Sequence, residues 1–208
     1  MENNGFSFQI TVSDNQVLSL DQISVCEPVP AGDGASAWVK LTFLQCPECP
    51  LQEQDSVCCP LAFGIRKVSD MLGSWNISYD SVQYECRHGN YRCRKTTDLQ
   101  TALGCFFGHV FPLWCPGIRT AWDLSDAGCP FHQYISLLLE EDNVMHIYKQ
   151  VCGRMLHRLE HCRQLPSDAV PNALVCLHSF ATLIHMQSED LGQQEPARSN
   201  RAAVLSET

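Results

Sequence analysis

The sequence predicts an α+β fold, in which an antiparallel sheet built from N-terminal hairpins packs against about four helices. Two observations predict this class. Short segments that alternate polar and apolar residues come first, with turn residues between them. Apolar residues at helical spacing dominate the later part of the chain. Strands in pairs followed by a run of helices are typical of α+β domains with an antiparallel sheet.

The strands are expected in two hairpins and one further segment. Residues 6–12 alternate polar and apolar side chains, and residues 16–20 follow a Ser-Asp-Asn turn, which predicts the first hairpin. Residues 38–43 alternate in the same way and predict a third strand. Residues 79–86 and 91–94, on either side of His-Gly-Asn, predict the second hairpin.

The first two helices are expected around the second hairpin. Apolar residues recur at helical spacing over residues 61–72, and a proline opens this segment at its first turn. Asp98 is a typical N-cap for a helix over residues 99–110, which Pro112 and Pro116 are expected to end.

Two more helices are expected in the second half of the chain. Residues 116–131 are rich in Gly, Pro and Asp and are expected to be irregular. The longest amphipathic stretch then covers residues 138–159, and a last helix covers residues 172–186. The chain is therefore expected to form a single Cys-rich domain over 1–187, followed by a disordered polar tail over 188–208.

Charge and composition exclude several classes of function. The formal net charge of -9 disfavours binding to nucleic acid or to an anionic membrane, because both need basic residues. The N-terminal residues lack an apolar signal core, and no segment approaches about 18 uninterrupted apolar residues. We therefore expect a cytoplasmic protein whose partner is another protein, and neither a nucleic acid nor a membrane.

Cysteine is the unusual component, with 13 residues in 208. The odd number argues against complete disulfide pairing, and a reducing compartment favours metal binding or simple burial. Cys105, Cys152 and Cys176 stand among Leu, Val and Phe residues and are expected to be buried as small apolar side chains.

The strongest chemical signal is the C-x-x-C motif of Cys46 and Cys49, which two adjacent cysteines follow. Such a motif lets two thiolates bind one tetrahedral metal ion, and structural zinc prefers four soft ligands. Cys59 begins a predicted helix, where the helix dipole favours the thiolate. The fourth ligand is left open between Cys115 and Cys129, each of which precedes a proline.

Two alternatives use the same or other residues. Cys46 and Cys49 would serve a thiol redox sensor, although the motif has prolines on both sides and does not open a helix. His157, Glu160 and His161 match the H-x-x-E-H pattern of a metal-dependent hydrolase. The competing interpretation is a solvated last turn of a helix, where cationic residues are favourable.

Other catalytic patterns are missing from the sequence. It contains no G-x-G-x-x-G, Walker A or G-x-S-x-G motif. It also contains no H-x-E, and its only C-x-E overlaps the C-x-x-C motif, which excludes a zinc deaminase.

Four motifs occur in a fixed order along the chain. They are Q-C-P-E-C-P-L at 45–51, C-P-L-A at 59–62, L-Q at 99–100 before a Leu/Phe-rich helix that closes near a Cys-Pro, and N-A-L-V at 172–175 with F-A at 180–181. This pattern, over roughly residues 6–186, resembles an uncharacterised bacterial family defined by a domain of unknown function. The resemblance implies no activity.

The resemblance also implies a ligand set. The cysteines that recur in the family correspond here to Cys46, Cys49, Cys59 and Cys115, which is the number that a closed structural zinc site needs. The family usually has Gly before the last Cys-Pro, whereas this chain has Trp114 there and a Gly-Cys-Pro at 128–130. The sequence thus predicts a zinc-stabilised bacterial protein–protein interaction or regulatory module with structural Zn²⁺ and no catalytic residue.

Overall fold

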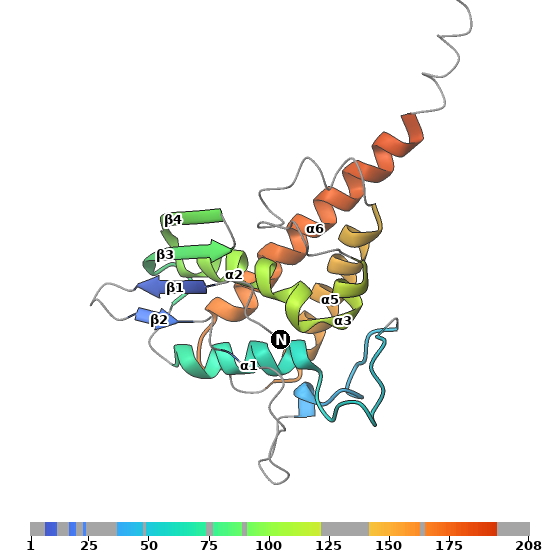
Figure 1. Cartoon of the computed structure of the whole chain (residues 1–208), viewed down its shortest axis with the longest axis horizontal. Helices are drawn as coiled ribbons and strands as arrows, with labels where there is room; N and C mark the ends of the chain where they lie inside the picture. Colours follow the sequence, from blue (N-terminus) through green and yellow to red (C-terminus); the bar gives the residue numbers. More distant parts are fainter. Residues whose placement is uncertain are drawn as a thin grey trace, which may run out of the picture.

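The computed structural model of the chain describes residues 7–11, 17–19, 23, 37–47, 49–73, 77–88, 91–121, 142–162 and 165–194. It confirms the α+β class. A four-stranded antiparallel sheet of order β2-β1-β3-β4 stands at one side of the molecule, and the helices occupy the rest (Figure 1).

Both predicted hairpins are present in the sheet. β1 (Ser7–Thr11) pairs with β2 (Val17–Ser19), and β3 (Ser81–His88) pairs with β4 (Tyr91–Asp98). β1 also pairs with β3 and so joins the two hairpins into one sheet. Alternation places one set of side chains inward, and these residues are buried: Phe8, Ile10, Val82, Tyr84 and Cys86.

The inward face of the sheet packs against α2 (Leu99–Trp114). Phe8 stacks on Tyr84 and meets the edge of Phe106 on α2, with ring centroids 5.3 Å apart in both pairs. Asp98 caps the helix as predicted, since its Oδ1 accepts a hydrogen bond of 2.8 Å from the backbone N–H of Thr101.

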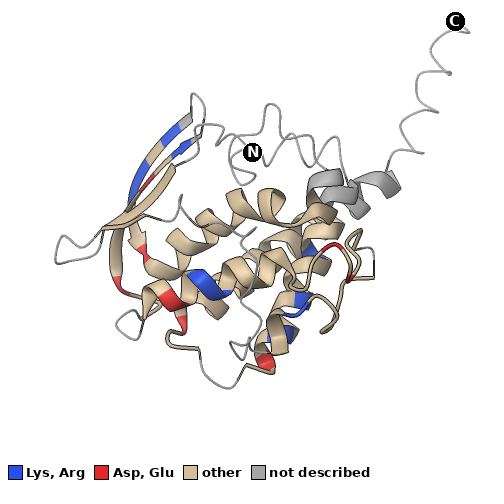
Figure 2. Cartoon of the chain, turned by 60° about the horizontal axis from the view of Figure 1, so that its bottom comes forward, with Lys and Arg blue, Asp and Glu red and all other residues tan. Residues whose placement is uncertain are grey.

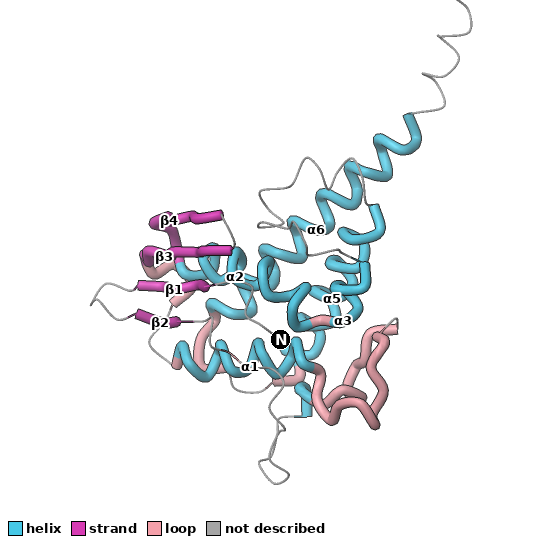
Figure 3. Tube along the Cα trace, viewed as in Figure 1, coloured by secondary structure: helices cyan, strands magenta, loops and turns pink. Residues whose placement is uncertain are grey.

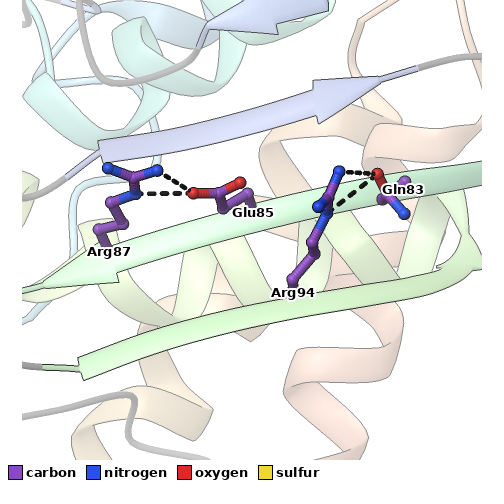
Figure 4. A network of polar contacts seen from close by, with 4 residues as sticks. All are labelled: Gln83, Glu85, Arg87 and Arg94. Carbon is purple, nitrogen blue, oxygen red and sulfur yellow. Dashed lines mark hydrogen bonds and ion pairs between the residues drawn. The ribbon is translucent and has the colours of Figure 1, made fainter.

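The outward face of the sheet is polar. Arg87 donates to Glu85 along β3, and Arg94 on β4 donates to Gln83 at 2.8 and 3.1 Å (Figure 4). Figure 2, in which Lys and Arg are blue, shows basic residues along this hairpin. The Arg87 guanidinium lowers the pKa of the exposed Glu85 carboxyl. These arginines are therefore partnered, solvated side chains.

The predicted strand over residues 38–43 is wrong. The chain instead forms a short 3-10 helix, η1 (Ala37–Val39), and a single bridge between Lys40 and Cys58. The carbonyls of Trp38, Lys40 and Leu41 accept hydrogen bonds from the side chain of Arg158, which takes the place of a neighbouring strand.

Apart from a helix at Pro116–Ala121, which was not predicted, the helices lie at their predicted positions, but not all their ends match. They are α1 (Pro60–Leu72), α2, α3 (Pro116–Ala121), α5 (Asp142–Glu160) and α6 (Ala169–Gln194). The segment expected to be irregular begins with α3, and its remainder lies outside the described residues. The last helix begins earlier than predicted and continues into the first part of the segment assigned to the tail.

Pro112 was expected to end α2, but the helix continues to Trp114. A proline at this position leaves the carbonyl of Gly108 without its usual helical donor. The hydroxyl of Tyr148 on α5 donates to that carbonyl at 2.9 Å and is itself buried. A contact between two helices thus satisfies the backbone group that the proline leaves free.

α6 packs against α2 and α5. In the described part of the chain it is the one helix long and apolar enough, over Ala169–Met186, to cross a membrane by length and composition. The sequence was expected to contain no such segment. A helix in the core of a soluble protein meets the same two criteria, and 39% of this window is buried within the protein.

Candidate metal centre

The four cysteines predicted from the sequence line one pocket of about 450 Å³. Cys46 and Cys49 come from the loop before α1, Cys59 from the start of α1, and Cys115 from the junction of α2 and α3. In Figure 3 this loop, drawn in pink, leads into the end of α1 that lies near α3 and α5. The fold therefore brings together residues that lie far apart in the sequence.

Backbone hydrogen bonds shape the loop that carries the C-x-x-C motif. The backbone N–H of Cys49 donates to the carbonyl of Cys46 at 3.1 Å, which closes a tight turn. The side-chain amide of Gln45 donates to the carbonyl of Leu51 at 2.8 Å and ties the two ends of the motif together. Both cysteines are half-buried in this turn.

Each of the other two cysteines precedes a helix that begins with proline. Burial raises the pKa of Cys59, whereas the Arg158 charge and the backbone N–H groups of Ala62 and Leu61 lower it. The Cys59 sulfur makes no cap hydrogen bond of normal length, so these N–H groups act on it as nearby dipoles.

Cys115 occupies the equivalent place before α3. Burial is the main cause that raises the pKa of Cys115 to about 12, and the N–H groups of Ile118 and Gly117 oppose it. Two helix starts in separate parts of the chain therefore direct backbone N–H groups toward pocket sulfurs. These N–H groups oppose the effect of burial on the pKa of the two thiols but do not overcome it.

The four sulfurs influence one another electrostatically. Burial, followed by the charges of Cys59 and Cys49, raises the pKa of Cys46 to about 11. The charges of Cys59 and Cys46 also raise the pKa of Cys115. Without a cation Cys46 and Cys115 are therefore neutral thiols at physiological pH, and a bound divalent ion would displace their protons.

The sulfurs share the pocket but do not surround a single point. Within the described ranges, no three His, Cys, Asp or Glu side chains are grouped as ligands of one metal ion. Coordination at about 2.3 Å would therefore need rotation of these half-buried side chains toward the middle of the pocket.

Arg158 is the important residue that the sequence analysis missed. Its side chain is only 1% exposed and donates to the carbonyls of Trp38 and Lys40, both at 2.8 Å, and of Leu41 at 3.2 Å. Among the described residues no carboxylate pairs with it, and its Nε has no hydrogen-bond partner.

A buried guanidinium needs negative charge nearby. The Arg158 charge lowers the pKa of both Cys46 and Cys59, so these sulfurs would supply that charge once a bound cation displaces their protons. Arg158 lies within the H-x-x-E-H motif, on a segment that could be interpreted as a solvated helix face. Arg158 lies three residues after Met155 and next to Leu159, both of which are buried, and this spacing could have indicated that Arg158 is buried as well.

Of the other cysteines named from the sequence, the described ones do not line this pocket and differ in burial. Cys129, the rival fourth ligand, lies outside the described residues. Cys152 is fully buried as predicted, and the Cys115 charge adds to the effect of burial in raising its pKa. Cys105 is only half-buried, and Cys176 is exposed, so its predicted burial is wrong. Cys176 lies on the side of α6 that faces away from α2 and α5, because its neighbours Leu174 and Leu177 face the core.

The H-x-x-E-H residues lie at the exposed end of α5. His157 Nδ1 and Glu160 Oε2 are 2.7 Å apart, and the rings of His157 and His161 are 5.4 Å apart. His161 packs its ring against Phe43, whereas His157 also lines the cysteine pocket. The carboxylate that a hydrolase would use as a base is thus engaged by one of the two histidines.

Comparison with known proteins gives a family but no activity. A family model described as Domain of unknown function (DUF6901) matches residues 3–120. The chain belongs to this family. The matched part of this DUF6901 protein contains Cys46, Cys49, Cys59 and Cys115, and it ends before α5 and Arg158. No curated protein and no solved structure matches the chain.

Proposed function

We propose that this DUF6901 protein is a zinc-stabilised module that acts through contact with another protein. Zn²⁺ bound by Cys46, Cys49, Cys59 and Cys115 would tie the loop before α1 to α1 and to the α2–α3 junction. The observation that carries the proposal is that four cysteines from three separate segments line one pocket.

The chemistry of the pocket supports a structural ion. Four cysteine ligands complete a tetrahedral zinc site and leave no position for a substrate or an activated water. The walls add apolar side chains from several elements, among them Leu51, Leu61, Trp114 and Val151. An apolar wall strengthens metal–thiolate bonding by excluding water.

Charge balance supports the same ion. A zinc ion with four thiolates carries a net charge of about −2, which is costly to bury without a positive partner. Arg158 and Arg154 both lower the pKa of Cys46, and Arg154 also lines the pocket. The module therefore already holds cations where the anionic complex would form.

The two alternatives have weaker support. A redox-sensing thiol needs a lowered pKa, whereas the pKa of Cys46 is raised to about 11. A hydrolase at His157 and His161 needs a free carboxylate base, whereas Glu160 contacts His157. The all-cysteine site is the function that the geometry supports best.

The expected protein contact has one feature in its favour. Val175, Leu183 and Met186 are exposed on one side of α6, and each is about half exposed or more. Exposed apolar side chains along one helix face are typical of protein-binding surfaces.

The test is the metal content of protein purified under reducing conditions, measured by mass spectrometry of the elements. Cys49→Ser should carry about one zinc per chain less than the wild type, because it removes one of four ligands. Cys176→Ser is the matched control and should keep the wild-type content, since Cys176 is an exposed cysteine outside the pocket. Equal zinc in Cys49→Ser and wild type would refute the proposal.

A second pair of measurements separates the alternatives. Glu160→Gln should leave the zinc content unchanged, whereas loss of the metal there would favour the H-x-x-E-H site. A zinc-free wild-type protein with a reversible Cys46–Cys49 disulfide would favour the redox sensor.

A further inference from the structure

A second group of cysteine and histidine side chains, of the types that bind metal ions, lies where the inward face of the sheet meets α2. Cys86 on β3 is directly opposite Cys93 on β4 in the register of the hairpin. Cys105 and His109 follow on α2, four residues apart and therefore on one side of the helix. None of the four lines the pocket of the first site.

The closest pair already has the separation of two zinc ligands. The Sγ of Cys86 and the Nε2 of His109 are 3.5 Å apart, and both residues are buried. Two ligands that share a tetrahedral zinc at about 2.3 Å for sulfur and about 2.05 Å for nitrogen lie about 3.6 Å from each other.

The other ring nitrogen of His109 has the partner expected of a metal ligand. Nδ1 lies 2.9 Å from the carbonyl of Cys105, an acceptor, and so carries the ring proton. Nε2 then presents its lone pair to Cys86. Histidines that bind metals commonly donate their second nitrogen to a backbone carbonyl in this way.

The remaining two sulfurs meet at the hydroxyl of Tyr84. Cys93 Sγ is 3.6 Å from this oxygen, and Cys105 also interacts with it. Burial is the main cause that raises the pKa of Cys86 to about 12, and the charges of Cys105 and Cys93 add to it. The hairpin and α2 therefore place Cys86 beside His109, and Cys93 and Cys105 beside the Tyr84 hydroxyl.

The four residues follow the order of elements in one known kind of zinc site, although the first two cysteines are further apart in sequence than the roughly two to four residues usual there. Six, eleven and three residues separate Cys86, Cys93, Cys105 and His109 in turn. In ββα zinc fingers, a hairpin supplies two cysteines and the helix that follows supplies two ligands on one face. β3, β4 and α2 follow one another in the same order here.

We propose that Cys86, Cys93, Cys105 and His109 form a second site that binds a soft divalent cation such as Zn²⁺. In the described part of the chain these four do not yet surround a single point. Binding would draw Cys93 and Cys105 from the Tyr84 hydroxyl to the Cys86–His109 pair. Both thiols are half-buried, so an ion can enter past them.

This second site is independent of the first, and metal content distinguishes their outcomes. With both sites, the wild type should bind about two zinc ions, Cys49→Ser and Cys93→Ser about one each, and the double variant none. If only the first site exists, Cys93→Ser keeps the wild-type content of about one and Cys49→Ser has none. If only the second site exists, Cys49→Ser keeps the wild-type content of about one zinc and Cys93→Ser has none.

Cobalt substitution checks the identity of the ligands. Co²⁺ bound to Cys49→Ser should show thiolate-to-cobalt charge-transfer absorption from a site with three sulfurs and one nitrogen. The spectrum of Cys93→Ser should be that of a site with four sulfurs. Far-UV circular dichroism establishes that each variant is folded, and Cys105→Ser replaces Cys93→Ser if the latter does not fold.

Alkylation of the native protein gives a second measure. Bound zinc should protect the half-buried Cys93 and Cys105 from alkylation, and a chelator should expose them, as read by peptide mass spectrometry. A Cys93→Ser or Cys105→Ser protein that keeps the full metal content of the wild type overturns the proposal.

Discussion

Replacing Arg158 by methionine should destabilise the protein strongly, even without metal. The substitution keeps an apolar stem of similar length but removes the donors to the carbonyls of Trp38, Lys40 and Leu41. The carbonyl of Lys40 keeps the backbone N–H of Phe43 as a donor at 3.2 Å. The buried carbonyls of Trp38 and Leu41 would lose their donor at a cost of about 1–3 kcal/mol each, or about 2–6 kcal/mol for both. Loss of the buried charge offsets part of this, because its desolvation cost disappears. We therefore expect a net loss of about 2–5 kcal/mol.

Urea denaturation followed by circular dichroism, with a chelator present, measures this loss. With a slope of about 3 kcal/mol per molar urea, the midpoint should fall by about 1–2 M. Arg154→Met is the matched control. Arg154 lines the same pocket and also lowers the pKa of Cys46, but it makes none of these three hydrogen bonds.

Arg154→Met should therefore change the stability of the metal-free protein by less than about 1 kcal/mol. Equal midpoints for the Arg158→Met and Arg154→Met proteins would refute the role given to the buried guanidinium. In the presence of zinc, both variants should bind the metal more weakly than wild type, because each removes positive charge near Cys46.

Tyr148→Phe should cost about 1–3 kcal/mol by urea denaturation, since the carbonyl of Gly108 loses its donor. Pro112→Ala restores a backbone N–H beneath that carbonyl, so the same Tyr148 substitution should cost clearly less in this background; equal costs would contradict the explanation. In the metal-free protein, the contribution of Cys46 to stability should be full below pH 9.0 and should fall as the pH rises toward about 11. The reason is that the pKa of Cys46 in the folded protein is raised above its ordinary value of 9.0. Between these two pH values the folded state holds more protons than the unfolded state. Thermal melts with and without zinc at about pH 8 and about pH 10 check this; an alkaline loss of stability as large with zinc as without it would show that these thiols are not its cause.

Local patterns were sufficient to predict both hairpins and the starts of α1 and α2. Alternation along β1 and β3 reflects a sheet with one buried face, and Asp98 and Pro60 mark helix starts through their own backbone chemistry. The same alternation failed over residues 38–43. There the backbone partner is a side chain from α5, which periodicity in the segment itself cannot reveal.

Helix ends were predicted less well for a similar reason. Pro112 breaks a helix only if the freed carbonyl finds no other donor. The hydroxyl of Tyr148 supplies that donor from another helix. The outcome at Pro112 was therefore decided by packing between α2 and α5.

The sequence by itself determined the fold class, the family and three candidate ligands at Cys46, Cys49 and Cys59, and it left the fourth open between Cys115 and Cys129. These follow from periodicity and from short motifs, which are local properties. Only the tertiary structure decided that these three and Cys115 line one pocket beside Arg158. It also placed Cys86 next to His109 and directly opposite Cys93, the contacts on which the proposed second site rests. Both results depend on contacts between distant segments, because burial and charge are set by the neighbours that folding brings together.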